Sequence, residues 1–100
     1  MNDSLNTQAD FVYQVVTTHL SPIYHPGDLL LVKRRKPSNG DLGLFKYKHV
    51  LYSRRLIFYD NRILLVPINN AHSTLTLDKS SDIDCEGVIL GKVIGNAILD

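Results

Sequence analysis

Hydrophobic residues along the chain fall into short runs, and turn-forming residues separate these runs. The runs are rich in β-branched and aromatic residues, a composition typical of β-strands. The pattern predicts strands at residues 11–18, 28–34, 42–47, 50–59, 62–66, 75–77 and 85–99, of which 75–77 is a short edge strand. The run at 28–34 has the length and apolar character of a strand that is buried on both faces. The predicted fold class is therefore mainly β, with little helix.

Proline, glycine and asparagine mark where the chain turns. Two prolines and one glycine in residues 19–27 exclude a regular helix or a central strand there, so this segment is expected to form a shaped loop. Asn39-Gly40 predicts a tight turn, because both residues readily adopt positive φ. The runs between 42 and 66 are expected to form an antiparallel meander. Three glycines at four-residue spacing in the final run favour a bent strand.

Length and composition indicate one small domain. The chain has 100 residues, of which 44% are hydrophobic and 21% are charged, close to the average of soluble globular proteins. Nine aspartates stand against one glutamate and alanine is scarce, so good helix formers are few. The polar segment at residues 1–10 is expected to be a flexible terminus or linker stub, and residues 11–100 are expected to form the domain.

Charge and cysteine usage exclude several classes of protein. The formal net charge is +1, so the molecule as a whole does not attract nucleic acid or anionic lipid. Its single cysteine, Cys85, cannot form an internal disulfide, and the sequence has neither a secretory signal nor an apolar run long enough to cross a membrane. The expected protein is cytoplasmic, with no membrane partner.

Familiar catalytic and metal-binding patterns are missing from the sequence. The four histidines show no zinc-ligand spacing, and no Gly-x-Ser-x-Gly elbow is present, so neither a metal nor a cofactor is expected. Cys85 lies between Asp84 and Glu86, whose charges would raise the pKa of its thiol. It is therefore expected to be a small structural residue.

Two groups of basic residues stand out. The first contains four consecutive cations, Lys33, Arg34, Arg35 and Lys36. They form either a patch that contacts phosphates or a solvated turn that keeps a sheet edge from pairing with other chains. The second is Arg54-Arg55, inside a predicted strand. Since alternate residues of a strand face opposite ways, one of these two arginines should point inward or into a cleft.

The order of several short motifs resembles the LexA-like self-cleaving peptidases. Residues 19–41, HLSPIYHPGDLLLVKRRKPSNGD, are similar to the S-M-x-P…GD-LL-V…P-x-NGD signature of that family, which type I signal peptidases share more loosely. The similarity extends to the strand at 11–18, YSRRL at 52–56, LVPIN at 65–69 and the E-G-x-x-x-G-x-V pattern at 86–93. It covers residues 11–94, and the last two motifs favour the LexA, UmuD and phage-repressor branch. The resemblance implies bent antiparallel sheets of the β-clip type.

The family cleaves peptide bonds with a serine and a lysine, and the resemblance places neither residue in this chain. The serine position falls on His19 and the lysine position falls on Arg54. A guanidinium has a pKa above about 12 and cannot serve as the general base that activates a serine. Ser21 and Ser53 are the less favoured substitutes. The chain also lacks the Ala-Gly or Cys-Gly dipeptide at which relatives cut themselves.

Three functional readings follow from the resemblance. The favoured one is a catalytically inactive LexA-like domain that forms a homodimer and serves as the oligomerisation module of a phage or bacterial transcriptional regulator. Contact with DNA would then come through a DNA-binding domain upstream, or weakly through the basic run. The second is an accessory module like processed UmuD, which docks on a DNA polymerase or another partner. The third is a self-cleaving peptidase with an unorthodox dyad, which would respond to RecA.

Overall fold

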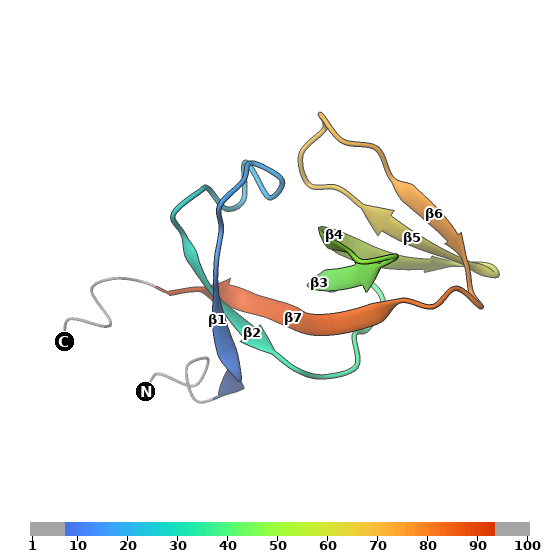
Figure 1. Ribbon diagram of the computed structural model, residues 1–100, viewed down its shortest axis with the longest axis horizontal. Coiled ribbons are helices and arrows are strands. Elements are labelled where there is room, and N and C mark those ends of the chain that lie inside the picture. Colours follow the sequence, from blue (N-terminus) through green and yellow to red (C-terminus); the bar gives the residue numbers. More distant parts are fainter. Residues whose placement is uncertain (1–7, 94–100) are drawn as a thin grey trace.

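In the part of the chain that the structure describes, seven antiparallel strands form one continuous sheet. The protein is described by a computed structural model, which covers residues 8–93. The strands are β1 (Phe11–Gln14), β2 (Leu29–Lys33), β3 (Leu42–Tyr47), β4 (Val50–Tyr59), β5 (Arg62–Val66), β6 (Leu75–Asp78) and β7 (Asp84–Lys92). Their order across the sheet is β1-β2-β7-β3-β4-β5-β6 (Figure 1). The predicted mainly β fold is confirmed, as is the meander of β3, β4 and β5. No helix in the described part of the chain is long and apolar enough to cross a membrane.

The first and last strands differ from the prediction. β1 ends at Gln14 instead of residue 18, because Val15 then exchanges backbone hydrogen bonds with the end of the following loop. Its N–H donates to the carbonyl oxygen of Asp28 at 2.9 Å, and its own carbonyl oxygen accepts from Gly27 at 2.7 Å. β7 begins at Asp84 and ends at Lys92, and the predicted continuation to residue 99 lies outside the described residues from 94 on.

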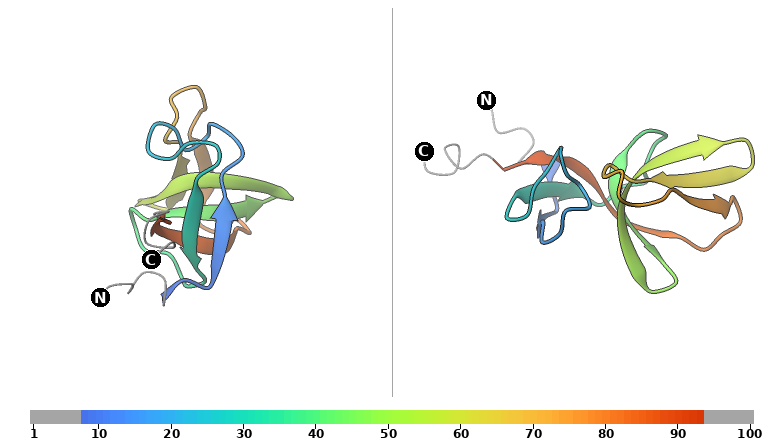
Figure 2. Two further views of the ribbon diagram at one scale, coloured as in Figure 1. Left: turned by 90° about the vertical axis from the view of Figure 1, so that its left-hand side faces the viewer. Right: turned by 90° about the horizontal axis from the view of Figure 1, so that it is seen from above.

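β7 is a long, bent strand that pairs with β2 over one part of its length and with β3 over another (Figure 2). Its pairing with β2 shifts by one residue next to Gly91, and its pairing with β3 shifts by one residue next to Gly87. Such bulges bend a strand and increase its twist. The predicted bent strand is therefore confirmed over the described part, and the bend gives the sheet two packed regions.

Each packed region has its own hydrophobic core. The core around β1 and β2 contains the buried residues Val15, Leu20, Leu30, Val32, Leu44 and Ile89. The core enclosed by β3, β4, β5 and β6 contains the buried residues Phe45, Leu56, Leu65 and Leu77. Leu44 and Phe45 are neighbours in β3 and point to different cores, as the alternation of side chains along a strand requires. The prediction that the second strand is buried on both faces is also confirmed, since Leu30, Leu31 and Val32 are all at most 6% exposed.

Tight turns hold the meander in register. Lys48 and His49 both have positive φ, of 51° and 69°, and they close the β3–β4 hairpin. The predicted Asn39-Gly40 turn is present, with Gly40 at φ 94°. It leads from β2 to β3, which do not pair with each other. Asn39 Oδ1 instead accepts a hydrogen bond from the backbone N–H of Phe58 at 2.9 Å, so this turn is fastened to β4.

Candidate functional site

Two loops that are far apart in sequence meet next to β4. The 15–28 loop connects β1 to β2 and the 67–74 loop connects β5 to β6, and both extend on the same side of the molecule (Figure 1). The Asn69 side-chain amide donates to the carbonyl oxygen of Thr18 at 2.8 Å and so ties the loops together. The half-buried rings of His19 and His72 lie edge to face, with centroids 4.3 Å apart and planes at 80°. The junction therefore places two imidazoles side by side.

Arg54 adds a buried cation to this junction. It lies in β4 opposite Gly43 of β3, and only 6% of its surface is exposed. Its Nη1 donates to the carbonyl oxygen of Ser53 at 3.1 Å, and its guanidinium carbon is 5.4 Å from the centroid of the Tyr52 ring. Its Nε is buried and has no hydrogen-bond acceptor among the described residues. The prediction that one arginine of the pair points inward is therefore confirmed for Arg54.

The electrostatics of the junction follow from its positive charge. Burial is the main cause that lowers the pKa of His19, and the nearby His72 and the Arg54 guanidinium lower it further. Burial also lowers the pKa of the Arg54 guanidinium, which nevertheless stays protonated because its ordinary value is so high. No ion pair found among residues 8–93 involves any of these three side chains. The junction thus joins a permanent cation to two titratable imidazoles.

Comparison with known protein families identifies the fold. The family model described as Peptidase S24-like matches residues 1–94. The chain belongs to the Peptidase S24-like family. This confirms the family predicted from the short motifs at 19–41 and beyond. A search of the curated proteins finds no match to the chain.

In this S24-like domain, neither of the two substitute serines is hydrogen-bonded to an imidazole in the described part of the chain. The hydroxyl of Ser21 donates to the carbonyl oxygen of Tyr24 at 3.3 Å. Ser53 is 7% exposed and follows the alternation of β4, so its side chain faces away from that of Arg54. Neither hydroxyl has a hydrogen bond to a histidine among the described residues.

The basic run of the S24-like domain is largely paired within the protein. Lys33 Nζ lies 3.6 Å from a carboxylate oxygen of Asp10, and Arg35 Nη1 lies 3.1 Å from one of Asp41. The guanidinium of Arg34 lies 4.5 Å from the centroid of the Phe11 ring. Lys36 is exposed, and no ion pair among the described residues includes it. These contacts fit a solvated turn beside a sheet edge better than they fit a free phosphate-binding patch.

Sequence reasoning found two members of the junction and missed the third. The resemblance points to His19 and Arg54, whereas the sequence presents His72 only as one of four histidines without zinc-ligand spacing. The signal that points to His72 is its position just after the P-x-N motif of Pro67 to Asn69. Asn69 accepts a backbone hydrogen bond from Ala71 at 2.9 Å on its Oδ1 and thereby shapes the loop that carries His72.

Cys85 behaves as a structural residue. It is half-buried and packs against the core of β3 to β6. Burial is the main cause that raises the pKa of its thiol, and Glu86 contributes, whereas the expected contribution of Asp84 is not among the causes. Among the described residues no group of three side chains has the arrangement of a metal site.

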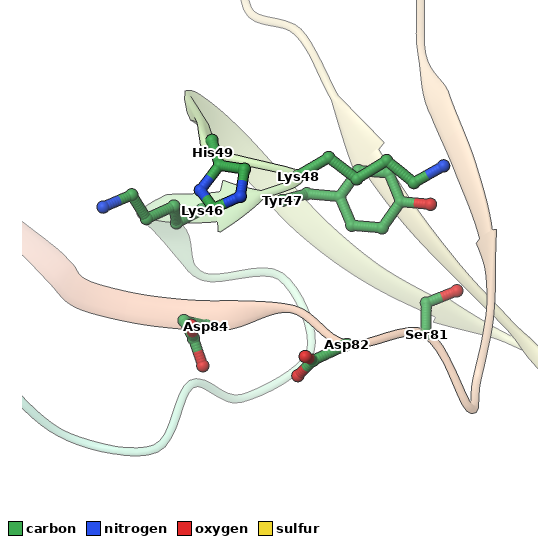
Figure 3. Close-up of a pocket in the computed structure, with 7 residues that line it drawn as sticks. All are labelled: Lys46, Tyr47, Lys48, His49, Ser81, Asp82 and Asp84. Carbon is green, nitrogen blue, oxygen red and sulfur yellow. The ribbon is translucent and has the colours of Figure 1, made fainter.

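A groove of about 530 Å³ lies between the tip of the β3–β4 hairpin and the segment that leads into β7 (Figure 3). It is lined by Lys46, Tyr47, Lys48, His49, Ser81, Asp82 and Asp84. Basic and acidic side chains face it from opposite sides, and all seven residues are exposed or half-exposed. The groove therefore holds no buried polar group that requires a ligand.

Proposed function

We propose that this S24-like domain does not cleave peptide bonds and that it acts by self-association, as the oligomerisation module of a phage or bacterial transcriptional regulator. The observation that carries the first part is the junction of His19 with Arg54. These are the residues that the resemblance aligns with the nucleophile and the base of the family, and in the fold they lie close enough for the charge of Arg54 to lower the pKa of His19. The regulator role is inferred from the family resemblance.

The chemistry at this junction does not suit peptide-bond hydrolysis. A general base must lose its proton near neutral pH, and a guanidinium does not. His19 has a free imidazole and can accept a proton, but a nucleophile must lie within hydrogen-bond reach of it. Ser21 donates its hydroxyl to a backbone carbonyl instead, and Ser53 is buried on the other face of β4.

Prolonged incubation tests the absence of cleavage. We expect mass spectrometry to find only the intact chain at neutral and alkaline pH, with or without RecA filaments. The Ser21→Ala and Ser53→Ala variants should give the same result, and Ser73→Ala, an exposed loop serine, is the matched control. A specific fragment that is lost in Ser21→Ala or Ser53→Ala but kept in Ser73→Ala would overturn the proposal.

The outer face of β1 and β2 is the surface that we propose for self-association with a second copy. β1 is an edge strand, and Val12 on its outer face is 52% exposed. Val16 and Leu29 continue this apolar surface at 71% and 39% exposure. A two-fold interface places the same patch on both subunits, and an apolar patch is complementary to itself.

The charges at the border of this surface do not oppose a symmetric contact. Lys92 Nζ lies 3.4 Å from a carboxylate oxygen of Asp28, and Lys33 pairs with Asp10 as described above. Each cation therefore has an internal counter-charge. Two copies can approach along β1 without the repulsion that a patch of one sign would create.

Replacing Val12 with aspartate should disrupt the dimer. Two carboxylates would face each other in the apolar contact, so we expect dissociation to become at least about tenfold more favourable in sedimentation equilibrium. Val50→Asp is the matched control, because Val50 is 49% exposed and lies on β4, far from β1 in the strand order. A monomeric parent chain at high concentration, or equal dimerisation of parent and Val12→Asp, would contradict the proposed role.

A further inference from the structure

We propose that His19, His72 and Arg54 form a binding site for a small oxyanion, carboxylate or phosphate, where the 15–28 loop, the 67–74 loop and β4 meet. The site is inferred from a buried cation that has no counter-charge within the described residues, and from the two imidazoles beside it. The inference goes beyond self-association and does not depend on it.

The first argument is the unpaired guanidinium of Arg54. Its side chain is 94% buried, and among residues 8–93 Nε has no acceptor and Nη1 reaches only a backbone carbonyl oxygen. A buried charge is strongly unfavourable unless a partner compensates it. Arginine cannot become neutral to avoid this cost, because it does not lose its proton in proteins. A guanidinium presents its N–H groups as a fork that fits two oxygens of one carboxylate or phosphate. An oxyanion therefore has the charge and the geometry that would compensate this side chain.

The second argument is the pair of imidazoles. The rings of His19 and His72 are half-buried and 4.3 Å apart, and each neutral ring carries one N–H donor. His19, His72 and Arg54 come from three separate parts of the chain, so the fold brings three nitrogen-bearing side chains to one place. No carboxylate of the described residues forms an ion pair with any of them.

Several other cationic side chains already have partners. Lys33 and Arg35 of the basic run are paired with carboxylates, and Arg55 Nη1 donates to the carbonyl oxygen of Gly40 at 2.8 Å. In the groove of Figure 3, Lys46 and Lys48 line the same opening as Asp82 and Asp84. The junction differs from these places because the positive charge of Arg54 is buried and, among the described residues, has no counter-charge.

Binding at this site should depend on pH. The groups that face His19 are His72 and Arg54, and Tyr52 is the further titratable group beside Arg54. Burial above all, and then the electrostatic influence of His72 and Arg54, keeps the pKa of His19 below its ordinary value of 6.5. An oxyanion between these groups would offset the repulsion and favour the imidazolium, so binding takes up a proton. The affinity is therefore expected to increase as the pH falls toward and below 6.5.

Nuclear magnetic resonance of the isotope-labelled full chain tests the site with sodium acetate and sodium phosphate as probes. Titrations are made in Bis-tris buffer at constant sodium chloride, and the signals observed are the imidazole C–H groups and the arginine Nε–H groups. We expect saturable shifts at His19, His72 and Arg54. His25 and His49 are exposed and serve as internal controls, as does Arg55 for the arginine signals. The affinity for acetate, whose charge stays constant over this range, should increase a few-fold from about pH 7 to about pH 6.

Variants separate a specific site from general ion binding. Arg54→Gln should abolish the saturable shifts, and His72→Gln should weaken binding about tenfold, because each removes a donor to a charged group. His25→Gln is the matched control and should bind as the parent does. His72→Gln also covers the case in which Arg54→Gln does not fold, since His72 lies in a loop and is only half-buried.

Each outcome supports or overturns the site. Tighter binding of acetate assigns a planar carboxylate, and tighter binding of phosphate assigns a tetrahedral anion. Equal shifts at all four histidines, shifts that do not saturate, or unchanged binding in both Arg54→Gln and His72→Gln would overturn the proposal. A monomeric chain that still shows the saturable shifts would contradict self-association and leave the anion site supported.

Discussion

Replacing Phe45 with alanine is expected to lower the free energy of unfolding by about 3–5 kcal/mol. The Phe45 side chain is 1% exposed and fills the core that β3 to β6 enclose with Leu56, Leu65 and Leu77. Its ring lies so close to Gly43 that an added Cβ there would come within 3.0 Å of Cζ. Truncation would remove a large apolar surface and leave a cavity that this bent sheet cannot easily close. Urea denaturation followed by circular dichroism measures the change.

Phe58→Ala is the matched control for this experiment. Phe58 is in the same meander, on β4, but it is 43% exposed, so the same chemical change should lower the free energy of unfolding by less than about 1 kcal/mol. Equal effects of the two substitutions would show that Phe45 does not form the centre of this core.

Replacing Gly87 with alanine is expected to lower the free energy of unfolding by about 1–3 kcal/mol, because the new methyl group overpacks the core. An added Cβ at Gly87 would overlap Cγ1 of Val32 and would lie 3.3 Å from the carbonyl oxygen of Lys33. Val32 is 0% exposed and β-branched, so it has little freedom to move aside. Gly87 thus allows β7 to pass close to β2 at the bend.

The Val32→Ala variant isolates this contact. Val32→Ala alone removes buried methyl groups and is destabilising, but it also removes the atom that an alanine at position 87 would meet. In a double-mutant cycle the two changes together should therefore be less destabilising than their sum, by about 1 kcal/mol. Strict additivity would mean that the effect at position 87 has another origin, such as the lost flexibility of glycine at the bulge.

Much of this fold was predictable from local sequence. The five strands from β2 to β6 lie within one residue of their predicted bounds, since alternation and turn residues act over a few positions. The gap between the predicted strands at 42–47 and 50–59 located the β3–β4 turn, and the glycines of the last strand located the bend of β7. The order of short motifs was sufficient to predict the family to which the chain belongs.

The difference between the predicted and the observed end of β1 has a tertiary cause. Residues 15–18 have the composition of a strand, yet β1 ends at Gln14, because Val15 bonds to the end of its own loop and leaves the pairing with β2. β-propensity describes how well a side chain fits a pleated surface, and it does not state whether a partner strand continues. The end of β1 was therefore decided by the closure of the 15–28 loop.

The sequence by itself determined the strand pattern, the turns, the family and the presence of an arginine that had to point inward. Only the tertiary structure decided that this arginine is Arg54, that His72 stands beside His19, and that the guanidinium is left without a counter-charge within the described residues. The physical reason is that the two sets of features depend on interactions of different range along the chain. Strand propensity and turn conformation depend on neighbours in the chain. The two loops of the junction, in contrast, are separated by four strands in the sequence, and only the folded sheet brings them close together in space.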